Sequence, residues 1–139
     1  MREGFPSWLL QNNTKLEYLY LVNNSLLGPL QLPLHFHTNL SYLDISDNCV
    51  IGSIPIQIGT YLPRLRYLNM SGNGINGSIP SSFGNMSLLE SLDLSNNRLS
   101  SSILEHLTMV CASLYKLMLS NNCLQGQIFS GTFNLRFLQ

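Results

Sequence analysis

Apolar residues recur along the chain in a fixed frame around a repeated asparagine. In the segment LDLSNNRLSSSI, which begins at Leu92, leucines alternate with polar residues up to Asn97, and the apolar pattern then resumes. Apolar residues lie eight, five and three positions before each such asparagine and two positions after it. The five asparagines are Asn24, Asn48, Asn73, Asn97 and Asn122, at gaps of 24, 25, 24 and 25 residues. The chain is therefore predicted to be one array of five repeats, at 16–39, 40–64, 65–88, 89–113 and 114–137.

The positions before each asparagine predict a short strand. In LEYLYLVNN, Leu19 and Leu21 alternate with Tyr18, Tyr20 and Val22, so one face of the strand is apolar and the other is exposed. The chain must turn at the asparagine that follows, and its amide can bond backbone groups that the turn leaves unpaired. We expect the five repeated asparagines to form a ladder of hydrogen bonds between neighbouring coils.

The second half of each repeat predicts a return path without a long helix. A small residue and an aliphatic one are followed by proline at Pro55 and Pro80, which ends a strand because proline donates no backbone hydrogen bond. The stretch from Ser81 to Leu92 has apolar residues at helical spacing, enough for a turn or two of helix. A period of this length with leucines and an asparagine is typical of leucine-rich repeats. We predict an α/β solenoid, with a parallel β-sheet on the concave face and short helical or irregular returns on the convex face.

Composition excludes several classes of function. The formal net charge is zero and only 10% of residues are charged, which argues against nucleic-acid binding and against a polybasic membrane patch. No apolar run approaches the roughly 18 residues of a membrane span, so we expect neither an anchor nor a signal peptide in this chain. Cys49, Cys111 and Cys123 are odd in number and widely spaced, which predicts free thiols.

The detailed frame resembles the plant-specific subclass of leucine-rich repeats. NGSIPSSFGNMSLLESLDLSNNRL, from Asn76 to Leu99, has the Gly-x-Ile-Pro sequence that marks this subclass. FPSWLLQNNTKLEYLYLVNNSLLGPLQLP and CASLYKLMLSNNCLQGQIF, more narrowly, resemble the ectodomain of plant receptor-like proteins. The resemblance implies a membrane-anchored glycoprotein outside the plasma membrane that acts in defence or developmental signalling. Because that family lacks a kinase, the full-length protein is expected to need a partner receptor kinase.

Some positions depart from the frame. Ser101 and Leu104 replace the expected glycine and proline of the fourth copy, Phe129 replaces proline in the fifth, and Leu30 to Asn39 form an irregular return. The cysteine-bearing caps of the family are absent, and Leu138 lies 24 residues after Leu114, where a sixth copy is expected to begin. These features suggest an uncapped internal piece of a longer ectodomain. Because solenoids need capped ends, we expect the isolated chain to be poorly soluble or frayed at its termini.

The sequence predicts no enzyme, no cofactor and no metal site. His35 and His37 lack a third ligand at a suitable spacing, so an irregular surface loop accounts for them better, and His106 stands alone. Asp44 and Asp93 resemble a carboxylate pair, but LDIS and LDLS belong to the ordinary repeat frame. No nucleophile or phosphate-loop motif is present.

Binding is expected on the exposed strand positions of the concave face. Four tyrosines gather there, and tyrosine is common among residues that dominate binding energy. Tyrosine also favours strands and stacks across them, so a purely structural role stays open. The candidate ligand-binding residues are Tyr18, Tyr20, Tyr42, Asp44, Arg66, Tyr67, Asn69 and Lys116, with Glu17 beside them. The expected ligand is a peptide, a protein or a glycan.

The chain is rich in N-glycosylation sequons. They lie at Asn12, Asn23, Asn39, Asn69, Asn76 and Asn85. Glycans at these positions fit an extracellular solenoid. We expect Asn12 and Asn85 to be occupied more than Asn69, since a glycan on Asn69 would obstruct the tyrosines.

Two other functions remain open at this stage. The same type of repeat occurs in secreted inhibitors of microbial cell-wall-degrading enzymes. The five repeats could also be a structural spacer within a receptor ectodomain, with recognition elsewhere.

Overall fold

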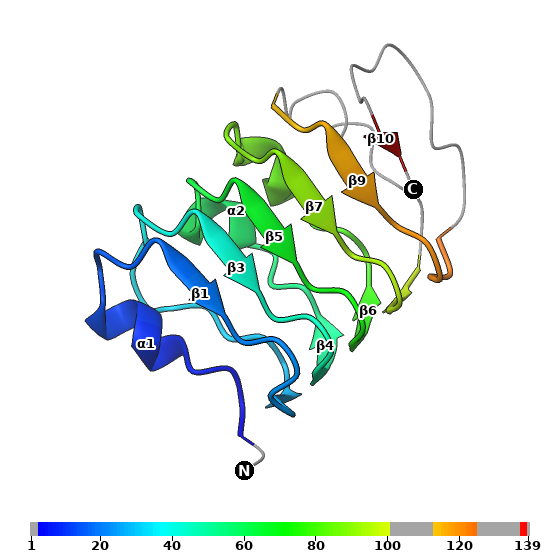
Figure 1. Ribbon diagram of the computed structural model, residues 1–139, viewed down its shortest axis with the longest axis horizontal. Coiled ribbons are helices and arrows are strands. Elements are labelled where there is room, and N and C mark those ends of the chain that lie inside the picture. Colours follow the sequence, from blue (N-terminus) through cyan, green and yellow to red (C-terminus); the bar gives the residue numbers. More distant parts are fainter. Residues whose placement is uncertain (1–2, 101–112, 125–136, 139) are drawn as a thin grey trace.

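The computed structural model describes residues 3–100, 113–124 and 137–138 as a solenoid of parallel strands. Its long sheet has six strands in chain order: β1 (Tyr18–Tyr20), β3 (Tyr42–Asp44), β5 (Tyr67–Asn69), β7 (Ser91–Asp93), β9 (Lys116–Met118) and β10 (Phe137–Leu138). Figure 1 shows these strands side by side as a single row of arrows. The predicted α/β solenoid of leucine-rich repeats is thus confirmed.

Because of the register of the long sheet, residues one repeat apart in the sequence lie opposite one another on neighbouring strands and form rows of side chains. Tyr18 faces Tyr42, which faces Tyr67, and the row continues through Ser91 to Lys116. The middle residue of each of the first five strands is a buried leucine, from Leu19 to Leu117. Burying a leucine side chain contributes about 1.5–3 kcal/mol, so this column is a main source of stability.

A second sheet follows the asparagine turns and was missed by the sequence analysis. It has four parallel strands, in the order β2 (Leu27–Gly28), β4 (Cys49–Ser53), β6 (Gly74–Gly77) and β8 (Arg98–Leu99). The sequence analysis starts the return path in this stretch, because a small residue and an aliphatic one are followed there by proline at Pro55 and Pro80. The chain instead continues as a short strand, with Gly28, Gly52 and Gly77 at positive φ. Glycine adopts that conformation without steric cost, so the strand can bend there.

The repeated asparagines form hydrogen bonds within and between coils. The Asn48 side chain accepts from the backbone N–H of Asn24 (2.8 Å) and Leu26 (3.0 Å), which lie on the preceding coil. Its amide nitrogen donates to the carbonyls of Leu21, Ile45 and Ser46. Equivalent contacts to the preceding coil are made by Asn73, Asn97 and Asn122, whereas the exposed Asn24 donates to the carbonyl of Val22.

The residue before each repeated asparagine adopts a left-handed backbone. These residues are Asn23, Asp47, Gly72, Asn96 and Asn121, with φ between 55° and 68°. Glycine, asparagine and aspartate tolerate this conformation better than other residues. The turn therefore explains the residue types at this position.

The return segments that the structure describes contain only short helices. α1 (Ser7–Asn12) precedes the first repeat, α2 (Ile58–Tyr61) follows β4, and the 3₁₀ helix η1 (Ser81–Asn85) follows β6. The predicted helical turn after Ser81 therefore ends at Asn85, well before Leu92. α2 and η1 lie close together, and the N–H of Gly59 donates a hydrogen bond to the hydroxyl of Ser82 (3.1 Å).

The irregular return that ends at Asn39 contains neither helix nor strand, and it corrects our expectation for His37. We expected a surface position, but His37 is only 3% exposed. Leu40 donates its N–H to Nδ1 of His37 (3.1 Å), so Nε2 carries the proton and donates to the carbonyl of Asn13 (2.9 Å). In later repeats the buried Leu62 and Met86 occupy the same position. His37 is thus a core residue that bonds two segments.

Further predictions concern the cysteines and the C-terminal part of the chain. Leu138 pairs with Leu117 in the register of β10 and β9, so the expected alignment of Leu138 with Leu114 is wrong by three residues. Cys49 and Cys123 are free and exposed, as predicted. Ser101, Leu104, His106, Cys111 and Phe129 lie outside the described residues.

Candidate functional site

Three tyrosines stack in one row across the exposed face of the long sheet. The ring centroids of Tyr18 and Tyr42 are 4.8 Å apart with an interplanar angle of 21°, and those of Tyr42 and Tyr67 are 5.8 Å apart at 29°. Their order follows from the register, which places these residues opposite one another on β1, β3 and β5. We call Tyr18, Tyr42 and Tyr67 the tyrosine row.

The stack restricts what the tyrosine row can offer a ligand. Ring faces that lie against a neighbouring tyrosine are covered, so Tyr42 presents mainly its ring edge and hydroxyl. Aromatic edges carry partial positive charge and the phenol can donate or accept a hydrogen bond. Tyr18 is 54% exposed, which leaves its side chain open at the end of the row.

Tyr20 lies beside the tyrosine row but does not join the stack. It is 57% exposed, and among the described residues no aromatic ring packs against it. Partial burial raises the pKa of Tyr20, and the charges of neighbouring tyrosines and of Asp44 raise it further. The phenol therefore stays neutral, and able to donate a hydrogen bond, to higher pH than a free tyrosine.

A second row of polar side chains runs through Tyr20, Asp44, Asn69 and Asp93. Asn69 accepts hydrogen bonds from the backbone N–H (2.9 Å) and hydroxyl (2.7 Å) of Ser71, and Asp93 does the same with Ser95. Asp44 is only 9% exposed and accepts from the N–H of Ser46 (3.0 Å). These side-chain oxygens accept hydrogen bonds from the turn that follows each strand and so stabilise it. This supports the structural role that the repeat frame suggested for Asp44 and Asp93.

The predicted charged residues occupy the margins of the site. Arg66 forms an ion pair with Glu90, with Nε and Oε2 3.1 Å apart, and this hydrogen bond raises the pKa of Arg66. Lys116 is half-buried on β9 in the same row as the tyrosines, and Glu17 is exposed before β1. The positive charge of Arg66 is therefore compensated by the carboxylate of Glu90.

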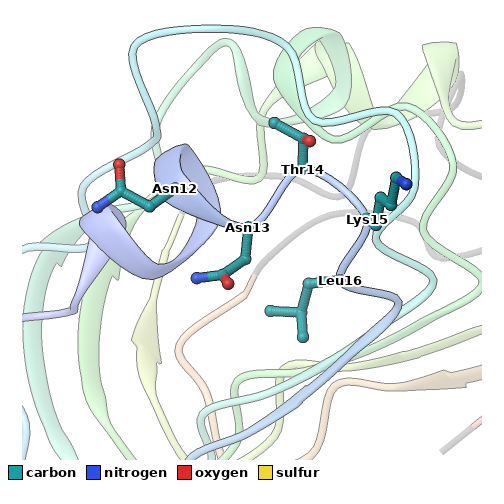
Figure 2. A pocket seen from close by; sticks show the side chains of 5 residues that line it. All are labelled: Asn12, Asn13, Thr14, Lys15 and Leu16. Carbon is teal, nitrogen blue, oxygen red and sulfur yellow. The ribbon is translucent and has the colours of Figure 1, made fainter.

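Two shallow cavities lie away from the tyrosine row. One, of about 320 Å³, is lined by Asn12, Asn13, Thr14, Lys15 and Leu16. Figure 2 shows these residues where α1 ends and the chain turns towards β1. The other, of about 380 Å³, is lined by Leu34, His35, Phe36 and Tyr61. Neither contains a residue that we predicted to bind ligand.

The sequons differ in accessibility. Asn12, Asn23, Asn39, Asn76 and Asn85 are exposed. Asn69 is half-buried, and its amide nitrogen donates to the hydroxyl of Tyr67 (3.4 Å). Asn39 donates to the carbonyl of Thr14 (2.7 Å). Asn12 and Asn85 both lie at the end of a short helix, in α1 and η1.

Within the described ranges, no three His, Cys, Asp or Glu side chains gather where a metal ion could bind. The helices of the same ranges are too short or too polar to cross a membrane. What the structure does bring together are the four tyrosines with Asp44 and Asn69, while Lys116 lies two strands beyond Tyr67.

Comparison with known proteins finds similar sequences among leucine-rich-repeat proteins. Residues 38–99 match the leucine rich repeat model. The chain is 43% identical to receptor-like protein 13 of Arabidopsis thaliana over 94% of its own length and 12% of the relative. It is 45% identical to Cuscuta receptor 1 of Solanum lycopersicum over 93% of its length, again covering 12% of the relative.

Solved structures give the same picture. The Arabidopsis receptor kinase HAESA, in complex with the peptide hormone IDA and the co-receptor SERK1, has 34% sequence identity and a TM-score of 0.78. The match covers 88% of this chain and 20% of that one. The chain thus spans about an eighth of the curated relatives and a fifth of this receptor.

Proposed function

We propose that the chain is a non-catalytic, ligand-binding segment of a plant cell-surface receptor. Its similarity to the leucine rich repeat model and to a segment of plant receptor-like proteins supports this proposal. The tyrosine row is the main observation that supports the proposal. Three neighbouring repeats place a large amphipathic ring at the same position of the outer sheet face, where Tyr18 is exposed, Tyr42 and Tyr67 are half-buried, and the rings stack on one another. Side chains that are already ordered lose little entropy when a ligand binds.

The proposal includes the surroundings of the full-length protein. The segment would lie on the extracellular side of the plasma membrane and act in defence or developmental signalling. Signalling would require a partner receptor kinase. The HAESA complex, which contains both a peptide hormone and a co-receptor, supports such an arrangement by similarity.

Glycosylation follows from the same proposal. We expect Asn12 and Asn85 to carry N-glycans more often than Asn69, because both are exposed whereas Asn69 is half-buried and bonded to Tyr67. Site-resolved glycopeptide mass spectrometry of the protein from plant tissue measures the occupancy. Full occupancy at Asn69 with empty Asn12 and Asn85 would contradict both the ranking and an open tyrosine row.

The function is tested by mutation within the full-length receptor. Tyr42→Ala and Tyr67→Ala together should abolish the ligand-triggered response while the receptor reaches the cell surface in normal amounts. Tyr61→Ala is a matched control, because Tyr61 lies on α2 beside Phe36 and outside the tyrosine row. A full response from the double variant would favour a structural spacer.

A further inference from the structure

Asp44 is a buried carboxylate with unusually few partners. It occupies the same position as Asn69 and Asp93, each of which accepts two hydrogen bonds from the serine two residues later. Asp44 accepts only one, from the N–H of Ser46 to Oδ1, although it is 9% exposed. In the described part of the chain, the one ion pair joins Arg66 to Glu90, so no cation neutralises Asp44. A buried carboxylate without a cation is costly, which makes Asp44 a candidate for an external partner.

Tyr20 supplies an aromatic surface next to this carboxylate. The register pairs Tyr20 with Asp44 on neighbouring strands. Tyr20 lies outside the stack of the tyrosine row and is more than half exposed, so a planar group can reach its ring. The negative charge of Asp44 also contributes to the raised pKa of Tyr20, after burial and the neighbouring tyrosines, which places the two groups within electrostatic reach.

The charge of the surrounding surface favours a cation. The exposed-face segments 17–22, 41–46, 66–71, 90–95 and 115–120 contain four acidic residues and two basic ones, although the whole chain has a formal net charge of zero. Arg66 is already paired with Glu90. Lys116 lies on β9, three strands from Asp44, which is roughly 14 Å at the usual strand spacing. Glu17 and Asp44 therefore leave the N-terminal end of the site negative.

We infer that Tyr20 and Asp44 form a subsite for an arginine side chain of a protein or peptide ligand. The guanidinium would stack on the ring of Tyr20 and donate a hydrogen bond to the second carboxylate oxygen of Asp44. Arginine fits this pair better than lysine, because its planar group stacks on aromatic rings and its fork of donors matches a carboxylate. The inference rests on the proposed function and specifies the chemistry that one part of the ligand must have.

A peptide titration of the receptor ectodomain that contains these repeats tests the subsite. The probe is acetyl-Gly-Arg-Gly-amide, with the lysine and glutamate analogues for comparison, and the signal is the NMR shift of the isotope-labelled Tyr20 ring. Asp44→Asn is the informative variant, since Asn69 shows that the fold accepts asparagine at this position. Asp47→Asn is the matched control, because it removes the same charge from an exposed turn of the same coil where other repeats carry asparagine.

The expected result is saturable binding in the order arginine, lysine, glutamate. Asp44→Asn should weaken binding of the arginine peptide by roughly tenfold, since a charge-assisted hydrogen bond becomes a neutral one. Asp47→Asn should change it less than twofold. Equal weakening by both variants, or equal binding of the glutamate peptide, would overturn the inference, as would an absence of saturable shifts at Tyr20.

The outcome is separable from that of the proposed function. If Asp44→Asn does not weaken binding of the arginine peptide while Tyr42→Ala and Tyr67→Ala together abolish the receptor response, the proposed subsite is wrong and the proposed function stands. If the peptide depends on Asp44 while the tyrosine variants respond fully, the subsite stands and the tyrosine row is not the response-determining surface.

Discussion

The asparagine ladder and the tyrosine row are neighbouring features of the same repeats, but they relate differently to the fold. Asn48 lies almost buried and makes five hydrogen bonds, three of them to the preceding coil. Tyr42 lies on the exposed face, where its ring contacts two other tyrosines of its row. The asparagine recurs in all five repeats, whereas the tyrosine position becomes Ser91 and Lys116. We call the residues that hold the coils together the frame of the solenoid, and the repeated asparagine belongs to it. A position whose residue type changes from coil to coil is available for recognition.

The largest effect is expected at the ladder. Asn48→Ala should lower the free energy of unfolding by about 3 kcal/mol, because it removes the acceptor for the N–H groups of Asn24 and Leu26 and the donor to the carbonyl of Leu21. The carbonyls of Ile45 and Ser46 keep hydrogen bonds from Asn73 and Asn23. Urea unfolding followed by circular dichroism measures the loss. Asn76→Ala, at an exposed position of β6, is the control and should cost less than about 0.5 kcal/mol. Equal losses would remove the distinction between the two kinds of asparagine.

A smaller loss is expected where two return segments touch. A Cβ atom on Gly59 would overlap the backbone carbonyl oxygen of Ser82, so Gly59→Ala must separate α2 from η1. We expect a cost of about 2 kcal/mol, typical of overpacking in a close-packed region. Gly4→Ala is the control, because its added Cβ would meet only the Leu27 oxygen at 3.6 Å. Thermal melting of the two variants side by side shows whether the returns belong to the frame.

His37 tests whether a polar core residue belongs to the frame. His37→Leu introduces the residue type that the next repeat has at the equivalent position, Leu62. The change removes the acceptor for the Leu40 N–H and the donor to the Asn13 carbonyl. The expected cost is about 1 kcal/mol, since the apolar replacement offsets part of the lost hydrogen bonding. His35→Leu, on an exposed neighbour, should have no measurable effect. A gain in stability from His37→Leu would show that the hydrogen bonds are dispensable.

The smallest effect is expected at the margin of the site. Arg66 and Glu90 form an ion pair whose side chains are 51% and 35% exposed. A double-mutant cycle of Arg66→Ala and Glu90→Ala should give a coupling of about 0.3 kcal/mol, as is usual for exposed pairs, and salt should weaken it. A coupling above about 1 kcal/mol would assign this pair to the frame after all.

The repeat period was sufficient to predict the solenoid, the strand positions and the place of each repeated asparagine. Local features that depend on packing between coils were harder to predict. The second sheet was missed because its strands are short, because β2, β4 and β6 contain glycine, which normally weakens a strand, and because proline follows soon after β4 and β6. His37 was misplaced because two hydrogen bonds from distant residues make its burial possible, and sequence spacing does not reveal them.

The candidate site was only partly predictable. Strand alternation indicated which tyrosines are exposed, and the fixed period indicated that they share a row. The stacking of the rings, the pairing of Arg66 with Glu90 and the burial of Asp44 depend on side-chain conformation. For Asp44, the informative feature is a missing bond, which appears only when equivalent residues of three coils are compared.

The most direct test compares the unfolding free energies of the Tyr42→Ala, Tyr67→Ala double variant and of Asn48→Ala in the same chain. If the tyrosine row is available for recognition, the double variant should lose about 1–2 kcal/mol, because it removes two stacking contacts worth about 0.5–1 kcal/mol each, and this loss should stay below that of Asn48→Ala. A loss as large as that of Asn48→Ala would show that the row holds the coils together, and would contradict the division between frame and binding surface.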